Sequence, residues 1–123
     1  MTAVAHIIEP PNSVLLLVGR EEFTPPESFG GRTCVATHDC VAIAVVSVDD
    51  APTSLSLSPT PDTEALMRLG EFQVETEGQL SVRDVYNREY DTVGVAPGLS
   101  LVTVWGNDAV EPSEIAVQFA QEA

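Results

Sequence analysis

The amino-acid sequence predicts an all-β protein, an antiparallel β-sandwich of about eight strands with one short helical crossover. The first observation is composition, because 17 valines and 10 threonines are β-branched residues that strands favour. The second is that 8 glycines and 9 prolines are spread along the 123 residues as turn signals. The third is that no window keeps helical periodicity over three turns. Strands with one apolar and one solvent-exposed face must bury their apolar faces against each other. This favours two stacked sheets over the alternative, a small β-barrel.

The first part of the chain contains a central strand and a hairpin. Residues 13–18 are apolar on both faces, which is typical of a strand in the middle of a sandwich. A loop with paired prolines and paired glycines follows. Residues 34–36 and 40–48 then predict a hairpin around the His38–Asp39 turn, and its second arm consists almost entirely of valine, isoleucine and alanine.

The remaining elements are shorter or more amphipathic. Residues 53–57 alternate leucine with serine, as a half-buried strand does. Residues 62–70 carry helix-capping residues and predict one or two helical turns between the sheets. Residues 71–83 predict a hairpin with one buried face and one face in water. The last two predicted strands cover residues 99–105 and 113–119.

Length and charge limit the possible functions. A chain of 123 residues is expected to form one domain, residues 1–123. The net charge is −14, from 19 acidic residues against 5 arginines and no lysine, and such a protein repels phosphate. Neither nucleic acid nor an anionic membrane surface is therefore an expected partner. No apolar run approaches the ~20 residues of a spanning helix and no basic leader is visible, so we expect a cytoplasmic protein.

The sequence carries none of the standard signatures of catalysis or cofactor binding. Phosphate-binding glycine loops, the G-x-S-x-G elbow and the H-E-x-x-H zinc motif are all missing. The lack of lysine also excludes Schiff-base chemistry. We therefore expect a protein that is not an enzyme and needs no cofactor.

One cluster, Cys34, His38 and Cys40, allows three interpretations. As a metal site it offers sulfur and imidazole ligands, but the cysteines stand further apart than in a zinc knuckle and no second pair completes the ligands. A disulfide would close a small loop, but a cytoplasmic location argues against one. The third interpretation, two reduced and partly buried thiols beside a polar hairpin tip, is favoured, with the metal site kept as an alternative.

Candidate contact residues lie in two neighbouring stretches. Acidic side chains alternate with apolar ones at the start of the predicted hairpin 71–83, which places the acidic ones on its solvent-exposed face. Residues 84–91 mix both charges with two tyrosines, a composition typical of recognition surfaces. The plainer interpretation of this second stretch is a loop between sheets in which a tyrosine hydroxyl is hydrogen-bonded to nearby backbone. The predicted partner-binding residues are Glu71, Glu75, Glu77, Asp84, Tyr86, Glu89, Tyr90 and Asp91.

The acidity has two explanations. Carboxylates on a rigid sheet can imitate the phosphates of a nucleic acid and steer a basic protein toward them. Alternatively, a host with a salt-adapted or GC-rich genome replaces lysine and raises acidic residues throughout its proteins, which the lack of lysine fits well.

Residues 71–74 and 80–82, followed by the Pro97–Gly98 turn and the strand 99–104, resemble part of the competence protein J family. The resemblance implies a small acidic β-sandwich with a nuclease-inhibitor or immunity role. Leu99 and Leu101 depart from it, because an aromatic residue is expected near this turn, and no binding residue can be carried over.

The expected function is therefore a protein-binding module, an inhibitor or immunity protein for a basic nuclease or toxin. One alternative is a structural or assembly sandwich whose acidity reflects its host. In that case the apolar strands 14–18 and 41–48, if placed at a sheet edge, would favour a homodimer. The other alternative is a small metal-binding protein that uses the cysteine–histidine cluster.

Overall fold

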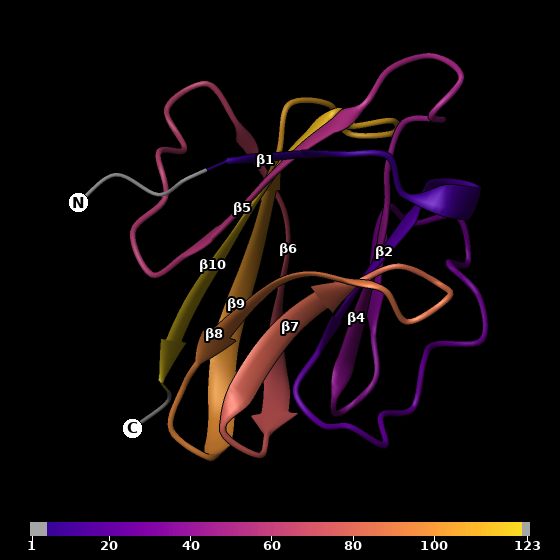
Figure 1. Ribbon diagram of the computed structural model, residues 1–123. Helices are drawn as coiled ribbons and strands as arrows, with labels where there is room; N and C mark the ends of the chain where they lie inside the picture. Colours follow the sequence, from indigo (N-terminus) through magenta and orange to yellow (C-terminus); the bar gives the residue numbers. More distant parts are fainter. Residues whose placement is uncertain (1–4, 122–123) are drawn as a thin grey trace.

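The computed structural model describes residues 5–121, which form two stacked five-stranded sheets (Figure 1). Sheet 1 has the strand order β1-β5-β10-β9-β6, and sheet 2 has the order β3-β4-β2-β7-β8. Neither sheet closes on itself, so the sandwich prediction is confirmed and the barrel alternative is wrong. The strands are β1 (His6–Ile8), β2 (Val14–Val18), β3 (Cys34–Ala36), β4 (Cys40–Ala44), β5 (Thr53–Ser58), β6 (Met67–Thr76), β7 (Gln79–Arg83), β8 (Glu89–Gly94), β9 (Gly98–Gly106) and β10 (Glu114–Gln121).

The main core fills the space between the sheets. Alternation along each strand sends every second side chain inward. In β2 these are Leu15 and Leu17, and in β10 they are Ile115 and Val117; each of the four is almost completely buried. Burying a leucine or isoleucine side chain of this kind stabilises the fold by roughly 1.5–3 kcal/mol. Both strands therefore contribute side chains to the core between the sheets.

A second, smaller apolar cluster lies on the outer face of sheet 2. Its buried members are Leu16, Val18, Cys40 and Ala42. The loop between β2 and β3 folds back over them and packs its own aromatic side chains, Phe23 and Phe29, onto the sheet. Because the loop covers this face, β2 and β4 are buried on both sides, as their uninterrupted apolar sequences predict.

Both apolar strands lie inside sheet 2, since β4 pairs with β2 and β3, and β2 pairs with β4 and β7. Neither offers the free edge on which a homodimer through these strands would depend.

The predicted helical crossover over residues 62–70 is wrong. The Leu66 amide donates to the Thr63 carbonyl (3.0 Å) in a turn, and β6 begins at Met67. Asp62, expected as a helix cap, accepts a hydrogen bond from the Glu64 amide (3.2 Å) in this turn instead. So short a segment forms a stable helix only by burying one of its faces, whereas the ten-residue strand β6 gains a full ladder against β9. Among the described residues the only helical element is the 3₁₀ turn η1 (Pro11–Ser13).

The predicted hairpin over residues 71–83 is also wrong in its pairing. Strand β6 pairs with β9 in sheet 1, whereas β7 pairs with β2 and β8 in sheet 2. Gly78, with φ 124°, turns the chain between the two layers. Val74 of β6 and Leu80 and Val82 of β7 therefore meet in the main core from opposite sides. The predicted alternation of buried and exposed residues is confirmed over residues 71–75 of β6, but in β7 the four residues 80–83 are all buried. No single solvent-exposed face connects the two strands.

The description of residues 84–91 as a loop is wrong in its second half, because β8 begins at Glu89. Because β1 and β8 were not predicted, residues 5–121 contain ten strands where about eight were expected. In the same part of the chain, no helix is long and apolar enough to cross a membrane.

Candidate functional site

Charged side chains from three segments gather at the end of the sandwich where β2 and β6 finish. Arg20 follows β2, and the turn between β3 and β4 carries His38 and Asp39. Strand β6 brings Glu75, and Glu77 lies in the turn after it. We call these five residues the end cluster.

Main-chain hydrogen bonds fix the three segments to one another. The Gly19 amide donates to the Asp39 carbonyl (3.1 Å), and the Glu77 amide donates to the Gly19 carbonyl (2.9 Å). The Glu75 amide donates to the His38 carbonyl (2.7 Å), which covers the free edge of β6. The backbones approach so closely that a Cβ at Gly19 would lie 2.1 Å from the Glu75 carbonyl oxygen. Glycine is therefore required at this position.

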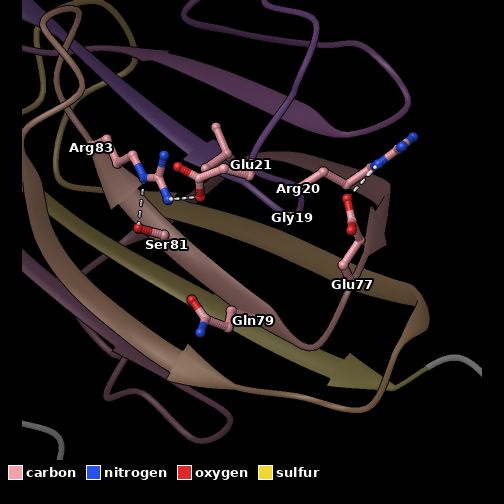
Figure 2. A pocket seen from close by; sticks show the side chains of 8 residues that line it. Gly19, Arg20, Glu21, Glu77, Gln79, Ser81 and Arg83 are labelled. Carbon is pink, nitrogen blue, oxygen red and sulfur yellow. Dashed lines mark hydrogen bonds and ion pairs between the residues drawn. The ribbon is translucent and has the colours of Figure 1, made fainter.

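Within the end cluster, Arg20 lies between two carboxylates. Its Nε donates to Glu77 Oε1 (3.0 Å; Figure 2), and its Nη1 lies 3.8 Å from Glu75 Oε2. The hydrogen bond from Arg20 to Glu77 and the charge of Glu77 raise the pKa of Arg20 above its usual value, and the charges of Glu75 and Asp39 add to this effect. The Arg20 guanidinium therefore interacts electrostatically with all three acidic residues of the end cluster.

His38 covers a buried carboxylate. Asp39 is 1% exposed, and its Oδ1 accepts hydrogen bonds from the Thr24 amide (2.9 Å) and the Thr37 hydroxyl (3.3 Å). Its Oδ2 accepts none from the described residues and lies 3.3 Å from His38 Nε2. The same imidazole nitrogen is 3.9 Å from Glu75 Oε2. The His38 imidazole, which is 57% exposed, thus lies between the buried Asp39 and the half-exposed Glu75.

A polar groove of about 210 Å³ leads from the end cluster over the outer face of sheet 2. Figure 2 shows Arg83 and Glu21 pointing toward each other on one side and Arg20 with Glu77 on the other. Arg83 is buried and donates to Ser81 Oγ (3.0 Å), Asn87 Oδ1 (2.9 Å) and Glu21 Oε2 (3.2 Å). Because its partners lie within the chain, Arg83 fastens the loop after β2 to sheet 2.

The predicted contact residues of β6 and its turn are spread along the strand. Glu75 and Glu77 belong to the end cluster, beside Arg20. Glu71 lies four residues further back on the outer face of sheet 1, where its Oε2 is 3.7 Å from Arg68 Nη1. The structure therefore brings together two of these three glutamates.

Asp84 and Tyr90 organise a turn. Asp84 is 2% exposed, and its Oδ1 accepts hydrogen bonds from the amides of Tyr86 (2.8 Å) and Arg88 (3.0 Å). Its Oδ2 accepts a hydrogen bond from the Tyr90 hydroxyl (3.0 Å). Burial and this contact raise the pKa of Tyr90 to about 12. The tied tyrosine was foreseen, although it binds a carboxylate and not the backbone; Tyr86, by contrast, is 75% exposed.

Glu89 and Asp91 occupy separate positions on β8. Hydrogen bonds from Thr92 and Ser81 lower the pKa of Glu89 below its usual value. Asp91 Oδ2 lies 3.4 Å from His6 Nε2 of β1, so this pair joins an edge strand of one sheet to an edge strand of the other. Both carboxylates already have partners within the chain.

The alternative metal site at Cys34, His38 and Cys40 is wrong. Cys34 lies in the main core, Cys40 lies in the outer cluster on the opposite face of sheet 2, and His38 is exposed at the tip of the turn. Both cysteines are free thiols, and their opposite faces exclude a disulfide as well. No group of three His, Cys, Asp or Glu side chains in residues 5–121 is arranged to hold a metal ion.

We expect both thiols to be unreactive in the folded protein. Burial raises the pKa of Cys34 to about 12, and burial together with the charge of Asp39 raises that of Cys40 to about 12. A thiol reagent at pH 8 should therefore label neither cysteine, because labelling requires the thiolate. Both should react in denaturant, which mass spectrometry can count. Rapid labelling of either cysteine without denaturant would contradict the burial described here.

The prediction from sequence missed the two arginines that organise this region, Arg20 and Arg83. Arg83 ends a strand and follows three residues, 80–82, that are apolar or small, which is a recognisable signal for a buried cation that needs partners. Arg20 carries no such signal, because its partners come from β6 and the following turn, 55 or more residues away.

Comparisons with known proteins identify a fold. No protein-family model matches the sequence, and no curated protein matches it. Among solved structures, the chain is similar to ComJ from Bacillus subtilis, described as an inhibitor of the DNA degrading activity of NucA. The TM-score is 0.71, the match covers 98% of each chain, and the sequence identity is 7%. The resemblance noted in the C-terminal half is thus confirmed as a likeness of fold, and the protein is a β-sandwich built like ComJ.

Proposed function

We propose that the protein is a non-enzymatic inhibitor that binds a basic enzyme, most concretely a nuclease. The observation that carries the proposal is the match to a nuclease inhibitor over 98% of both chains. The net charge of −14 supports it, because a strongly acidic surface attracts a protein whose cleft binds phosphate. Adaptation of the host proteome explains the charge equally well but gives no reason for this fold.

Inhibition by such a molecule needs no catalytic or covalent step. A nuclease cleft is lined with cations that hold the DNA backbone, and carboxylates on a rigid scaffold can occupy the same cations. The end cluster offers carboxylates on main chain that hydrogen bonds already hold in place. Little main-chain entropy would then be lost on binding, which favours affinity.

The test is a DNA-degradation assay with a panel of small basic nucleases. NucA from Bacillus subtilis and any nuclease encoded beside this protein's gene should be included. We expect at least one enzyme to lose its activity at a stoichiometric amount of the protein. Raising the salt to about 0.5 M should weaken this inhibition by about tenfold or more, because screening shortens the reach of the charges.

A DNA-binding assay serves as the control, because competition for substrate would also slow degradation. The protein should not shift DNA in this assay. Full activity of every nuclease, with no binding heat in calorimetry, would overturn the proposal and leave host adaptation as the explanation of the charge.

A further inference from the structure

The end cluster contains more negative charge than its internal cation can balance. Glu75 and Glu77 both face Arg20, at 3.8 Å and 3.0 Å, and the buried Asp39 adds a third carboxylate. Arg20 supplies one guanidinium against these three carboxyl groups. The acidic side chains at this end of the molecule therefore outnumber the arginine that faces them.

A buried oxygen with no hydrogen bond shows that the cluster is incomplete in its own contacts. Asp39 Oδ2 is shielded from solvent and accepts no hydrogen bond from the described residues. Buried carboxylate oxygens are normally hydrogen-bonded, since leaving one unpaired is costly. His38 Nε2 lies 3.3 Å from this oxygen, and the side chain of His38 is 57% exposed.

The main chain that carries the two glutamates is held in place before any partner arrives. The amides of Glu75 and Glu77 donate to the His38 and Gly19 carbonyls, and the two side chains stay 50% and 62% exposed, open to a partner. Arg20 extends from a loop, and its side chain is 39% exposed. Ion pairs between solvent-exposed groups are weak, so the guanidinium is easily exchanged.

We propose that the end cluster is the docking position for an arginine side chain of a basic protein, and that Arg20 is an internal stand-in which the partner's guanidinium displaces. The proposal rests on the proposed function for the kind of partner. Arginine fits better than lysine, because its planar fork can engage Glu75 and Glu77 together.

One consequence separates this role from a structural one. Removing an internal competitor should strengthen binding, whereas removing a structural ion pair should weaken it or leave it unchanged. Arg20→Gln keeps a hydrogen-bond donor but loses the charge. We expect it to tighten binding of an arginine-containing partner by about two- to fivefold, the factor that corresponds to one exposed ion pair.

The experiment uses a tetra-arginine peptide, followed by NMR titration of the full chain at low ionic strength. No nuclease is required, so its outcome is independent of the inhibition assay. Amide signals of residues 19–20, 38–39 and 75–77 should shift most. Glu75→Gln combined with Glu77→Gln should weaken binding by about tenfold, and a tetra-lysine peptide should bind less tightly than tetra-arginine.

Glu71→Gln is the matched control. Glu71 lies on the same strand as Glu75, has a similarly exposed side chain (46% against 50%) and also faces an arginine, but it lies outside the end cluster. Its variant should change the affinity by less than about twofold. The proposal is overturned if Arg20→Gln fails to tighten binding, or if Glu71→Gln weakens it as much as the double variant does. Unfolding curves of all variants show whether each is folded.

Discussion

Replacing Asp84 with alanine is expected to lower the free energy of unfolding by about 3 kcal/mol. The carboxylate is buried and accepts hydrogen bonds from the Tyr86 and Arg88 amides and from the Tyr90 hydroxyl. Alanine leaves these donors without their acceptor at a position that is 2% exposed, although the residues of the turn around it face solvent. Urea denaturation followed by tryptophan fluorescence measures the change, since the chain has one tryptophan.

Asp108→Ala provides a control with the same chemistry in water. Asp108 also accepts two backbone hydrogen bonds, from the Val110 (3.0 Å) and Glu111 (2.8 Å) amides, and these lower its pKa. Its loop is exposed, so water replaces the lost acceptor, and the variant should cost about 1 kcal/mol or less. Equal losses at Asp84 and Asp108 would show that burial does not set the energy of the Asp84 turn.

Gly19→Ala is expected to destabilise the protein by about 3 kcal/mol, at the upper end of the range for an inserted methyl group. The new Cβ would lie 2.1 Å from the Glu75 carbonyl oxygen and 3.1 Å from Thr76 Cα. Both atoms belong to the backbone, so a change of rotamer cannot relieve the clash. Either the loop after β2 or the end of β6 must move, and thermal and urea unfolding will measure the loss.

Gly94→Ala is the matched control, because a Cβ there meets no atom within 4 Å and Gly94 does not have a positive φ. We expect its stability to change by less than about 1 kcal/mol, with a gain as the usual direction. If Gly19→Ala were as stable as Gly94→Ala, the close approach of the three segments at the end cluster would be wrong.

The strands could be predicted from sequence because alternation is a local property. Ile115 and Val117 face inward in β10, and Leu55 does so in β5, as their spacing indicates. Pairing is not local. A glycine turn between two amphipathic strands serves a hairpin and a crossing between layers equally well, and only the partners of β6 and β7 decide between them.

The sheet faces on which the two cysteines lie could have been predicted from the sequence. A hairpin with His38 and Asp39 at its tip places Thr37 opposite Cys40, and therefore Cys34 opposite Ile43. Cys40 and Ile43 are three residues apart on one strand, so their side chains point to opposite faces. Counting in this way would have excluded both the metal site and the disulfide.

The end cluster could not be predicted in the same way. Its members come from three segments that are far apart in the chain, and each segment alone resembles an ordinary polar turn. What unites them is the register of the β3–β4 turn against β6, through the hydrogen bond from the Glu75 amide to the His38 carbonyl. Such a tertiary contact leaves no pattern in the residues themselves.

The position of β10 in the middle of sheet 1, parallel to β5 and antiparallel to β9, has a consequence for biosynthesis. While the ribosome is still making the polypeptide, β5 and β9 have no strand between them, and that half of the nascent molecule lacks its central ladder. Sheet 1 can therefore be completed only after translation has delivered β10. Until then its unpaired strands are open to chaperones and to self-association.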